Sequence, residues 1–373
     1  MQPSFWEHDA MLDADYIVIG GGIVGLQTAL ELREFRPADR VVVLERGVLP
    51  TGASSRNAGF ACFGSLTEIL HDVDAMGEDA ALALVERRWR GLDQLRRRLN
   101  DDAIGYEALG GCELLFDAHL GALQRIDQVN DMLRPLFGCE VFSIDDAGLR
   151  TCGFGPTVSA LIRNPLEGQL HSGRLMRALA RLAAECGIEI HTGARVRTLE
   201  ETGGEVHVGI AGERHLTFRA PRVAVCTNGI TGELLPHVGI APGRGQVLVT
   251  EPVTGLPWRG AYHLDEGFYY FRNVGKRVLL GGGRNLDFDN EATSEMVVSE
   301  AIQSALEQLL HDTILPGRKV RIAYRWAGVM GFAADRQPMV RRLSDRIVLG
   351  FGCNGMGVAL SADVAAETAA LLM

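Results

Sequence analysis

The sequence lacks the segments that would direct a chain into or across a membrane. Its first fifteen residues are acidic and have no basic region ahead of an apolar one, so they do not predict a signal peptide. The longest apolar stretch, Tyr16 to Leu26, is too short to span a bilayer and is rich in glycine. We therefore expect a cytoplasmic protein without a membrane span.

Cysteine pairs and metal-binding motifs are also missing. The 7 Cys are odd in number and none are spaced as C-x-x-C, which favours free thiols over disulfides. The 10 His include no H-x-x-x-H pair on one helix face. These absences predict neither a disulfide framework nor a metal site.

An excess of basic residues is absent as well. The formal net charge is −10, so nucleic acid and anionic membranes are disfavoured as partners. With 373 residues and 47% hydrophobic content, the chain is too long for one ordinary core. It suits two interleaved domains.

The N-terminal region has the pattern of a strand, a helix and a second strand. Residues 16–19 and 41–44 are continuous apolar runs, as expected of strands buried on both faces. Residues 23–35 have helical spacing between them. Three elements within about thirty residues predict a right-handed βαβ unit.

Glycines occupy the turn between the first strand and the helix. Gly20, Gly22 and Gly25 satisfy G-x-G-x-x-G, and Glu45 ends the second strand. Gly20 would make the tight turn, Gly22 would admit a pyrophosphate at the helix N-terminus, and Gly25 would let helix and strand pack closely. Glu45 would bind the ribose hydroxyls and repel a 2′-phosphate. The motif predicts a dinucleotide site and disfavours NADP.

A second glycine motif, Gly350 to Gly355, follows an apolar strand at 347–349. Only eighteen residues remain after Gly355, so no later strand can bring an acid to a second ribose. We expect this loop and the helix start at 355–358 to face the pyrimidine edge of a flavin, where reduction places negative charge. The dinucleotide would then be FAD rather than NAD. Plain helix capping is the alternative for this loop.

The remaining chain alternates between helical and extended segments. Residues 75–136 have a helical pattern, and residues 174–186 predict a helix with Ser172 as N-cap and Gly187 as its stop. Strands are expected at 188–190, 194–199, 205–210 and 222–226, and then in an antiparallel series at 247–250, 267–272 and 277–281, before a helix at 292–310. We predict an α/β fold in which a Rossmann-like FAD-binding domain (1–75, 145–235 and 322–373) is interleaved with an α+β substrate domain built on a mostly antiparallel sheet (76–144 and 236–321).

Nine short stretches are informative when taken together: IGGGIVGL (19–26), VVVLERG (41–47), TGASSRNAGF (51–60), GQLHSGRLMRALA (168–180), GARV (193–196), CTNG (226–229), GRGQVLVTEP (243–252), WAGVMGFAADRQP (326–338) and GCNGMGVALS (352–361). In order and spacing they resemble the D-amino-acid oxidase superfamily of FAD-dependent oxidoreductases. Along nearly the whole chain, the sequence is most similar to the branch that contains glycine oxidase, sarcosine oxidase and γ-glutamylputrescine oxidase.

The resemblance implies roles for residues that follow the second strand. Ser54 and Ser55 would give hydroxyls to phosphate or ribose, and Arg46 would place a cation near the adenosine. Structural roles are the alternative for two residues, since Ser54 could cap a helix and Asn57 could form a turn.

Further residues would surround the rest of the cofactor. Asn57 to Gly59 would lie along the flavin, Val196 would cover the adenine, and Thr227 to Gly229 would close over the pyrophosphate. The residues expected to contact FAD are therefore Gly20, Gly22, Ile23, Val24, Gly25, Glu45, Arg46, Ser54, Ser55, Asn57, Ala58, Gly59, Val196, Thr227, Asn228, Gly229, Gly355, Met356, Gly357 and Val358.

The same resemblance implies oxidation of an amine or amino acid at its C–N bond. The α C–H would be held against flavin N5, hydride would leave to give an imine, and water would hydrolyse the imine. Since the flavin carries the chemistry, no catalytic side chain is assigned. Phe268, Tyr270 and Arg272 alternate onto one strand face and would form an aromatic cage beside a cation, with ordinary sheet packing as the alternative.

Two departures from the relatives leave the substrate and the electron acceptor open. Where glycine oxidase-like relatives carry an arginine that clamps the substrate carboxylate, this sequence has Met330. Arg284 or Arg325 could substitute, or the substrate lacks an α-carboxylate. Leu279 stands where some oxidases have a lysine near N5, and Lys276 lies too early. The acceptor is oxygen in an oxidase, and a quinone or carrier in a dehydrogenase.

Two other functions remain open. The same fold could oxidise a 2-hydroxy acid or alcohol, which usually needs a base for the hydroxyl proton, and His263 is the candidate. The chain could also be a non-catalytic flavin-binding subunit, which the missing arginine favours. The sequence leaves undecided whether the chain forms a homo-oligomer and whether the flavin is covalently attached.

Overall fold

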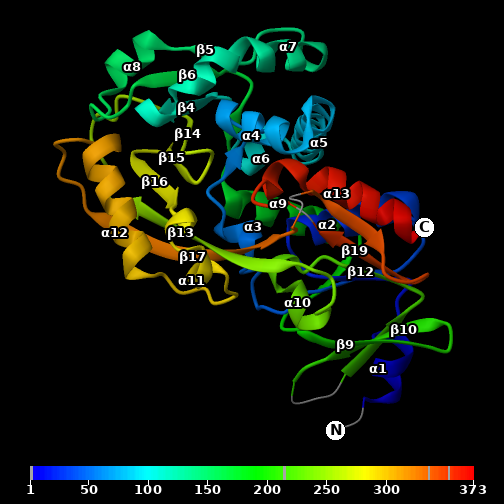
Figure 1. Cartoon of the computed structure of the whole chain (residues 1–373). Coiled ribbons are helices and arrows are strands. Elements are labelled where there is room, and N and C mark those ends of the chain that lie inside the picture. Colours follow the sequence, from blue (N-terminus) through cyan, green and yellow to red (C-terminus); the bar gives the residue numbers. More distant parts are fainter. Residues whose placement is uncertain (1–2, 213–215, 335–336, 352) are drawn as a thin grey trace.

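The computed structural model describes residues 3–212, 216–334, 337–351 and 353–373. Gly352 of the second glycine motif and residues 335–336 of the WAGVMGFAADRQP stretch lie outside these ranges. The chain builds two large sheets, and Figure 1 shows the antiparallel one on the left and the parallel one on the right.

A six-stranded sheet contains the N-terminal βαβ unit. Neighbouring strands are parallel except for the edge pair β18 and β19. Strands β1, β2 and β19 are buried along their whole length, which explains their continuous apolar sequences. The order is β18 (Met339–Arg342), β19 (Ile347–Phe351), β12 (Arg222–Val225), β1 (Tyr16–Ile19), β2 (Val41–Leu44) and β8 (Glu189–His191).

Helices cover one face of this sheet and a small antiparallel sheet covers the other. Val18 and Val43 point toward the helices, whereas Ile17 and Val42 point toward the small sheet, so alternate residues of each strand serve two cores. Figure 1 shows α2, α9 and α13 above the sheet and β9 and β10 below it. The bounds are α2 (Ile23–Phe35), α9 (Ser172–Glu185), α13 (Gly357–Leu372), β9 (Val196–Thr202), β10 (Glu205–Ile210) and β11 (Leu216–Ala220).

The second sheet has eight strands, and its neighbours pair antiparallel except β14 with β4. Its order is β17 (Ile322–Phe332), β13 (Ala241–Thr250), β16 (Arg277–Gly282), β15 (Tyr269–Val274), β14 (Ala261–Leu264), β4 (Gly111–Leu115), β6 (Ala160–Asn164) and β5 (Ser143–Ile144).

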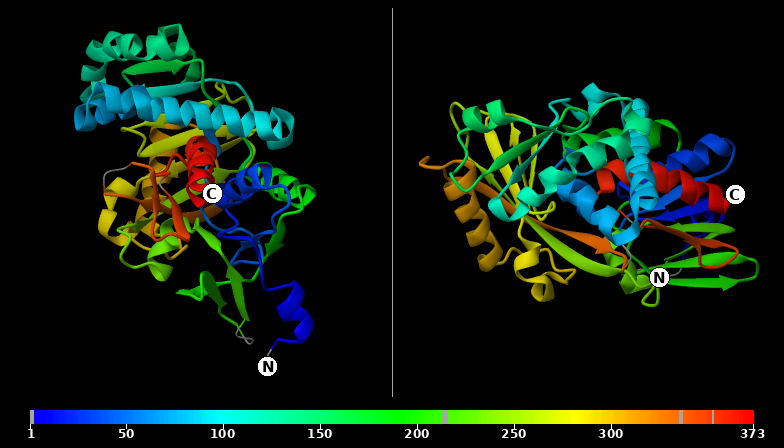
Figure 2. Two further views of the ribbon diagram at one scale, coloured as in Figure 1. Left: turned by 90° about the vertical axis from the view of Figure 1, so that its right-hand side faces the viewer. Right: turned by 45° about the horizontal axis from the view of Figure 1, so that its top comes forward.

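Helices also pack on the second sheet. One face forms a core with α12 (Glu300–Leu309), in which Phe271 and Leu306 are fully buried. The β4–β6 end packs against α4 (Leu66–Met76), α5 (Glu78–Leu99) and α7 (Ile126–Phe137). Helix α5 also packs on α13, so it ties the two sheets together, and Figure 2 shows its long course across the molecule.

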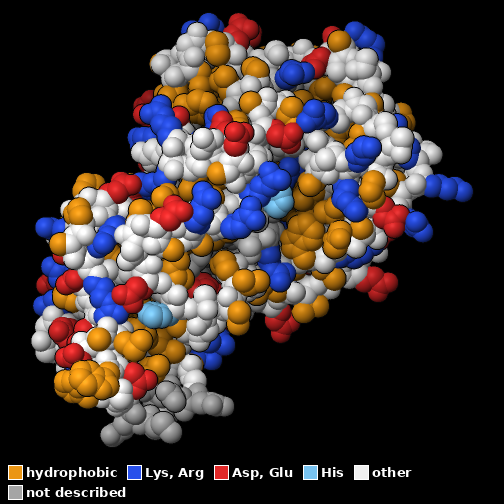
Figure 3. Space-filling view, turned by 180° about the vertical axis from the view of Figure 1, so that it is seen from behind, with side chains coloured by type: hydrophobic (Ala, Val, Ile, Leu, Met, Phe, Trp, Pro, Cys, Tyr) orange, Lys and Arg blue, Asp and Glu red, His pale blue; other side chains and the backbone are white. Residues whose placement is uncertain are grey.

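Short elements complete the chain. They are α1 (Phe5–Ala10), α3 (Ala53–Arg56), α6 (Asp101–Ile104), α8 (Asp146–Cys152), α10 (Thr231–Leu234), α11 (Phe288–Glu291) and the paired strands β3 (Phe60–Ala61) and β7 (Gly168–Gln169). Basic and acidic side chains are interspersed on the face that Figure 3 shows. In the part of the chain that the structure describes, no helix is long and apolar enough to cross a lipid bilayer.

The α/β class is confirmed, and several predicted elements differ in detail. The helical pattern at 75–136 is interrupted by β4, which pairs with strands distant in sequence, β6 and β14. His171 rather than Ser172 caps α9, because its imidazole accepts an N–H hydrogen bond from the first turn. Helix α12 begins at Glu300 rather than at 292, because Ser299 caps it there.

The predicted domain boundaries also differ at two strands. The boundaries at 145 and 322 assign β6 and β17 to the FAD-binding domain, whereas both strands pair within the eight-stranded sheet. Their sequences resemble buried strands of either sheet, and only long-range pairing decides between them.

Candidate functional site

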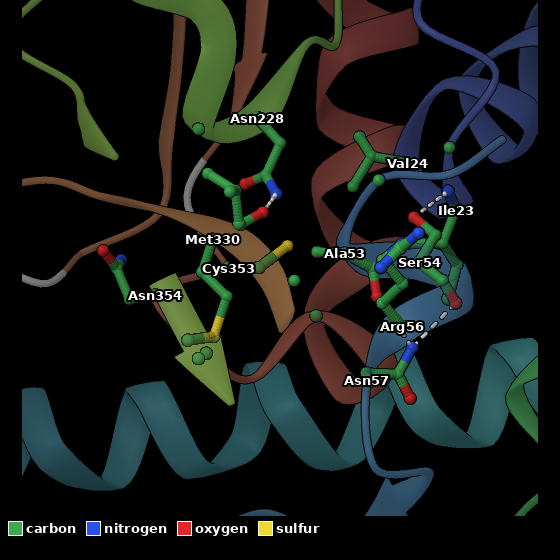
Figure 4. A pocket seen from close by; sticks show the side chains of 18 of the residues that line it. Ile23, Val24, Ala53, Ser54, Arg56, Asn57, Asn228, Met330, Cys353 and Asn354 are labelled. Carbon is green, nitrogen blue, oxygen red and sulfur yellow. Dashed lines mark hydrogen bonds between the residues drawn. The ribbon is translucent and has the colours of Figure 1, made fainter. Parts of the chain in front are cut away.

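A cavity extends from the carboxyl ends of β1 and β2 to the face of the eight-stranded sheet. Figure 4 shows labelled side chains on two sides of it. Ile23, Val24, Ala53, Ser54, Arg56 and Asn57 lie on one side, and Asn228, Met330, Cys353 and Asn354 lie on the other. The cavity thus brings together segments from both ends and the middle of the chain.

The first glycine motif forms one end of the cavity. Gly20 has φ +109°, and a Cβ there would lie 2.4 Å from the carbonyl oxygen of Cys226. A Cβ on Gly25 would lie 1.9 Å from the carbonyl oxygen of Gly20. The tight turn and the close packing of α2 on β1 therefore both require glycine. Gly20 lines the cavity, whereas Gly25 lies behind it.

The N-terminus of α2 faces the same space. Gly22 is its N-cap and offers no side-chain acceptor. The Ser54 hydroxyl accepts a hydrogen bond of 2.8 Å from the Ile23 N–H, as Figure 4 shows, so Ser54 caps the helix and lines the cavity. A Cβ on Gly22 would lie 2.9 Å from that hydroxyl oxygen. An oxygen atom at this helix end is therefore both accommodated and hydrogen-bonded.

Glu45 lies at the end of β2 with its carboxylate in the cavity wall. One carboxylate oxygen accepts the Gly21 N–H at 2.9 Å and the other accepts the Gly47 N–H at 2.8 Å. The group is buried, so these bonds fix its orientation and leave lone pairs for a further donor such as a ribose hydroxyl. Arg46 and Val196 line the same end of the cavity.

The segment that follows, residues 53–59, divides into lining and supporting residues. Ser55 is exposed and donates to the Pro50 carbonyl, so the structure places it outside the cavity. The Asn57 amide donates to the carbonyls of Ala53 and Ser54, which is the turn role considered for it, although the residue also lines the cavity. Ala58 and Gly59 line the cavity beside it.

Residues 227–229 and 355–358 form the opposite wall, and all of them line the cavity. Asn228 has φ +49°, and its side-chain oxygen accepts the Gly331 N–H at 3.2 Å. Gly355 has φ +96°, and Met356 is the N-cap of α13 without a side-chain capping bond. The 16-residue helix α13 therefore presents N–H groups to the cavity that its own cap does not satisfy.

Four of the five predicted substrate residues line the cavity, and the fifth does not. Phe268, Tyr270, Arg284 and Met330 are the four. Arg272 is buried and donates to the carbonyls of Ala58, Leu170 and Asn273, so its guanidinium supports the cavity wall from behind. Burial lowers the pKa of Arg272 to about 10. The predicted cage therefore has its aromatic members and lacks that cation.

Of the two arginines that could replace the missing carboxylate clamp, Arg284 lines the cavity and Arg325 does not. The Arg284 guanidinium carbon lies 4.1 Å from the ring centroid of Phe332 and 4.9 Å from that of Phe288, which orients the group. Arg325 instead pairs with Glu307 at 2.8 Å, outside the cavity. Leu279 is buried beside Ala58 and Val247 and does not line the cavity.

Sequence reasoning missed one wall of the cavity almost completely. It is formed by Phe60, Cys62, Glu68, His71, Asp72, Arg88 and Glu266, and it includes His263, which was considered only as a base for a hydroxy acid. These residues come from β3 and the loop after it, from α4, α5 and β14, and from the β14–β15 connection, and apart from Phe60 at the end of the 51–60 stretch no local motif marks them. Arg56 and Cys353 also line the cavity and were missed, although Arg56 stands between predicted residues and Cys353 lies within the second glycine motif.

The missed wall contains several acid–base pairs. Nδ1 of His263 lies 3.4 Å from a carboxylate oxygen of Glu68, and Arg88 lies 3.2 Å from Asp72. His71 lies 3.3 Å from Glu266. Burial lowers the pKa of His263, so its imidazole is neutral near pH 7.

Two residues of this wall, Cys62 and His263, belong to a buried trio that is completed by Glu167 behind them. Cys62, Glu167 and His263 bring a thiol, a carboxyl and an imidazole within 4.8 Å of one another. A metal ion would use these atom types, but it would need the thiol and the carboxyl without their protons. Burial raises the pKa of Glu167 to about 8 and raises that of Cys62 well above its usual value, so the protonated forms are favoured.

The residues at the glycine-loop end fit FAD. Gly22 leaves open a space that a Cβ would fill, the N-termini of α2 and α13 line the cavity, and Glu45 supplies an oriented carboxylate. Helix N-termini suit the pyrophosphate and the pyrimidine edge of a flavin, and the carboxylate suits a ribose.

Known proteins share this architecture. A family model described as "DAO: FAD dependent oxidoreductase" matches residues 15–371. The probable oxidoreductase OrdL of Rhizobium meliloti is 26% identical over 358 residues, covering 93% of this chain and 80% of that protein. The gamma-glutamylputrescine oxidoreductase of Escherichia coli is 25% identical over 366 residues with the same two coverages. Glycine oxidase from Geobacillus kaustophilus has a similar fold, with a TM-score of 0.77, 21% identity, and coverage of 97% of this chain and 95% of that one.

Proposed function

This chain belongs to the FAD-dependent oxidoreductase family, and from that membership and its cavity we propose that it oxidises the C–N bond of an amine or amino acid to an imine, which water hydrolyses. The observation that supports this proposal is one continuous cavity, which runs from the glycine loop to the aromatic residues on the face of the eight-stranded sheet. Gamma-glutamylputrescine oxidoreductase and glycine oxidase, two proteins it resembles, are named for amine substrates.

Each part of the chain has a role in this proposal. The N-termini of α2 and α13, together with Glu45, hold the dinucleotide. When bound, FAD accepts the two electrons that leave the α-carbon of the substrate as hydride. Phe268, Tyr270 and Met330 enclose the reacting carbon and exclude water from it.

Arg284 is the proposed partner of a substrate carboxylate. Its guanidinium is oriented by the rings of Phe288 and Phe332 and lines the cavity, whereas Arg272 and Arg325 direct theirs elsewhere. A planar guanidinium can bind a carboxylate through two N–H groups. The proposal therefore favours an amino acid over a simple amine.

A 2-hydroxy acid is the second candidate substrate. Such a substrate needs a base for its hydroxyl proton, and His263 lines the cavity with a pKa that burial lowers. The electron acceptor, oxygen or a carrier, remains part of the proposal, as do a cytoplasmic location and assembly as a homo-oligomer.

The experiment is anaerobic reduction of the purified yellow protein by a panel of amines, amino acids and matched 2-hydroxy acids. Loss of the visible flavin absorption with the nitrogen compounds alone supports the proposal. Loss with the hydroxy acids alone replaces it with the second candidate. If no compound bleaches the flavin, the chain has no such activity, and a flavin-binding role without catalysis takes its place.

A further inference from the structure

Glu68 and His263 form a pair in the cavity wall that the cofactor site does not use. Glu68 lies in the first turn of α4, where one of its carboxylate oxygens accepts the Ser65 N–H at 2.9 Å. The same oxygen lies 3.4 Å from Nδ1 of His263 on β14. The two side chains are 23% and 7% exposed, and both line the cavity. The His263 side chain is thus buried and that of Glu68 largely buried, and both are accessible to a molecule in the cavity.

His263 is the neutral partner of this pair. The imidazole is buried, and burial lowers its pKa. In the part of the chain that the structure describes, its Nε2 has no hydrogen-bond partner. A neutral imidazole with its one proton on Nδ1 would turn that N–H toward the Glu68 carboxylate 3.4 Å away and leave Nε2 as an acceptor. The Glu68 carboxylate therefore accepts a hydrogen bond from the Ser65 N–H, but the neutral His263 supplies no positive charge to balance it.

The other acids around this pair already have partners. Asp72 faces Arg88 at 3.2 Å, and Glu266 faces His71 at 3.3 Å. Glu113, the neighbour of His263 on β4, accepts from Ser65 and Thr67, and Glu167 accepts from the N–H groups of Phe63 and Gly64. Burial raises the pKa of Glu113 to about 7 and that of Glu167 to about 8, which favours their neutral forms. The other titratable residues that line the cavity around the pair are Cys62, His71, Asp72, Arg88, Glu266 and Tyr270, and Glu113 and Glu167 lie beside His263.

Aromatic rings pack around His263, the neighbour of Glu68 in the cavity wall. The Phe60 ring centroid lies 5.1 Å from that of His263 and 5.5 Å from that of Tyr270, both edge to face. Tyr270 is the register partner of His263 on β15, so the two side chains share one face of the sheet. Aromatic rings beside a desolvated carboxylate suit an ammonium ion, because the rings attract the cation and the carboxylate matches its charge.

We propose that Glu68 binds the ammonium group of the substrate and takes one of its protons, with His263 as a positioning residue. This inference rests on the proposed function. In the step, R–NH3+ and the Glu68 carboxylate become R–NH2 and the Glu68 carboxylic acid. The electron pair of the broken N–H bond stays on nitrogen, and it is the lone pair that hydride loss from the α-carbon requires. In a desolvated cavity the transfer removes two charges at once, which favours it relative to water. Glu68 returns the proton to solvent after the product leaves.

The test uses the holoenzyme and the variant Glu68→Gln. Glutamine at the third position of a helix preserves a capping box, so α4 should still form. Its amide oxygen can still accept from the Ser65 N–H, so the variant removes the charge and the basicity of the side chain. The matched control is Glu307→Gln on α12, which removes a carboxylate paired with Arg325 outside the cavity.

Binding is measured with tert-butylamine, an amine that has no α C–H and cannot be oxidised, by its change to the flavin absorption at pH 7. We expect wild type and Glu307→Gln to bind it equally and Glu68→Gln to bind it about tenfold or more weakly, because a desolvated charge partner is lost. Neutral tert-butanol should bind all three proteins equally. Equal binding of tert-butylamine by wild type and Glu68→Gln, or none by wild type, overturns the inference.

The pH profile of kcat/KM tests the proton transfer. With a substrate amine of pKa about 9, the wild type should already be near its maximum at pH 7, because it uses the protonated amine. Glu68→Gln can use only amine that is already neutral in solution. Its kcat/KM should therefore fall about tenfold per pH unit below the pKa of the amine. Identical profiles for the two proteins overturn the inference. The proposed function fails differently, since then no amine would bleach the wild type.

His263 has its own readout. His263→Leu removes the N–H that faces the Glu68 carboxylate, and it should move the acid limb of the kcat/KM profile to higher pH. His263→Asn can donate from a similar position and should restore the limb. If the acid limb stays in place in both variants, His263 is not a positioning residue.

Discussion

Gly22→Ala is the perturbation that tests the proposed pyrophosphate site. The added Cβ would lie 2.9 Å from the Ser54 hydroxyl oxygen, which marks where an oxygen atom sits against the Ile23 N–H. A phosphate oxygen approaching that N–H would meet the same methyl group. Losing one charge-assisted hydrogen bond costs about 1.5–3 kcal/mol, which corresponds to about 10- to 150-fold in the Kd for FAD.

The fold should tolerate this change. Gly22 has φ −79° and ψ −175°, an extended conformation open to alanine, so the cost is a poorer N-cap and a displaced Ser54 hydroxyl, about 1–2 kcal/mol together. The assay is titration of apoprotein with FAD, followed by quenching of flavin fluorescence, with thermal unfolding of the apoprotein alongside. Gly121→Ala is the control, since its Cβ would meet nothing within 4 Å. An FAD affinity of Gly22→Ala within twofold of wild type would refute the reasoning.

Three further predictions follow from named contacts. Gly25→Ala should lose about 3 kcal/mol or more of unfolding free energy in urea, since its Cβ would lie 1.9 Å from the Gly20 carbonyl oxygen; an unchanged midpoint would contradict this. Arg284→Met should raise KM for amino acids about tenfold or more and leave simple amines unaffected, whereas Arg325→Met should change neither; equal effects on both substrate classes would count against a carboxylate partner. Glu167 has a folded-state pKa raised to about 8 above an ordinary value of 4.5, so its stabilisation is complete at low pH and is lost as pH rises toward 8. Tm should therefore fall from pH 5 to pH 8, and Glu167→Gln should reduce that fall; an equal slope would remove Glu167 as its cause.

Local sequence predicted most of the residues that line the glycine-loop end of the cavity, although two of the predicted residues, Ser55 and Gly25, do not line it. Gly25 and Glu45 act through contacts between elements adjacent in the chain, and Gly20 acts through its positive φ and the close approach of Cys226. Their spacing therefore carries most of the physical information. The same holds for the start of α13, where the loop and helix are consecutive.

The substrate end could not be predicted in this way. Glu68 and His263 stand 195 positions apart in the sequence, and they meet only because the fold brings the first turn of α4 next to β14. Alternation along a strand placed Arg272 and Tyr270 on one face, which is where both lie, but it could not show that backbone carbonyls take up the Arg272 guanidinium. Strand β4 was missed because its partners β6 and β14 are remote in sequence.

The most direct test of the account is a single anaerobic turnover of the holoprotein with the best amino acid of the panel, in which flavin reduction and ammonia release are both quantified. If the C–N bond of a primary amine is oxidised and the imine is hydrolysed, ammonia and the keto product should each form in an amount equal to the flavin reduced. Full reduction of the flavin without ammonia, or reduction by the matched 2-hydroxy acid alone, would contradict the claim that this cavity is built for amine oxidation.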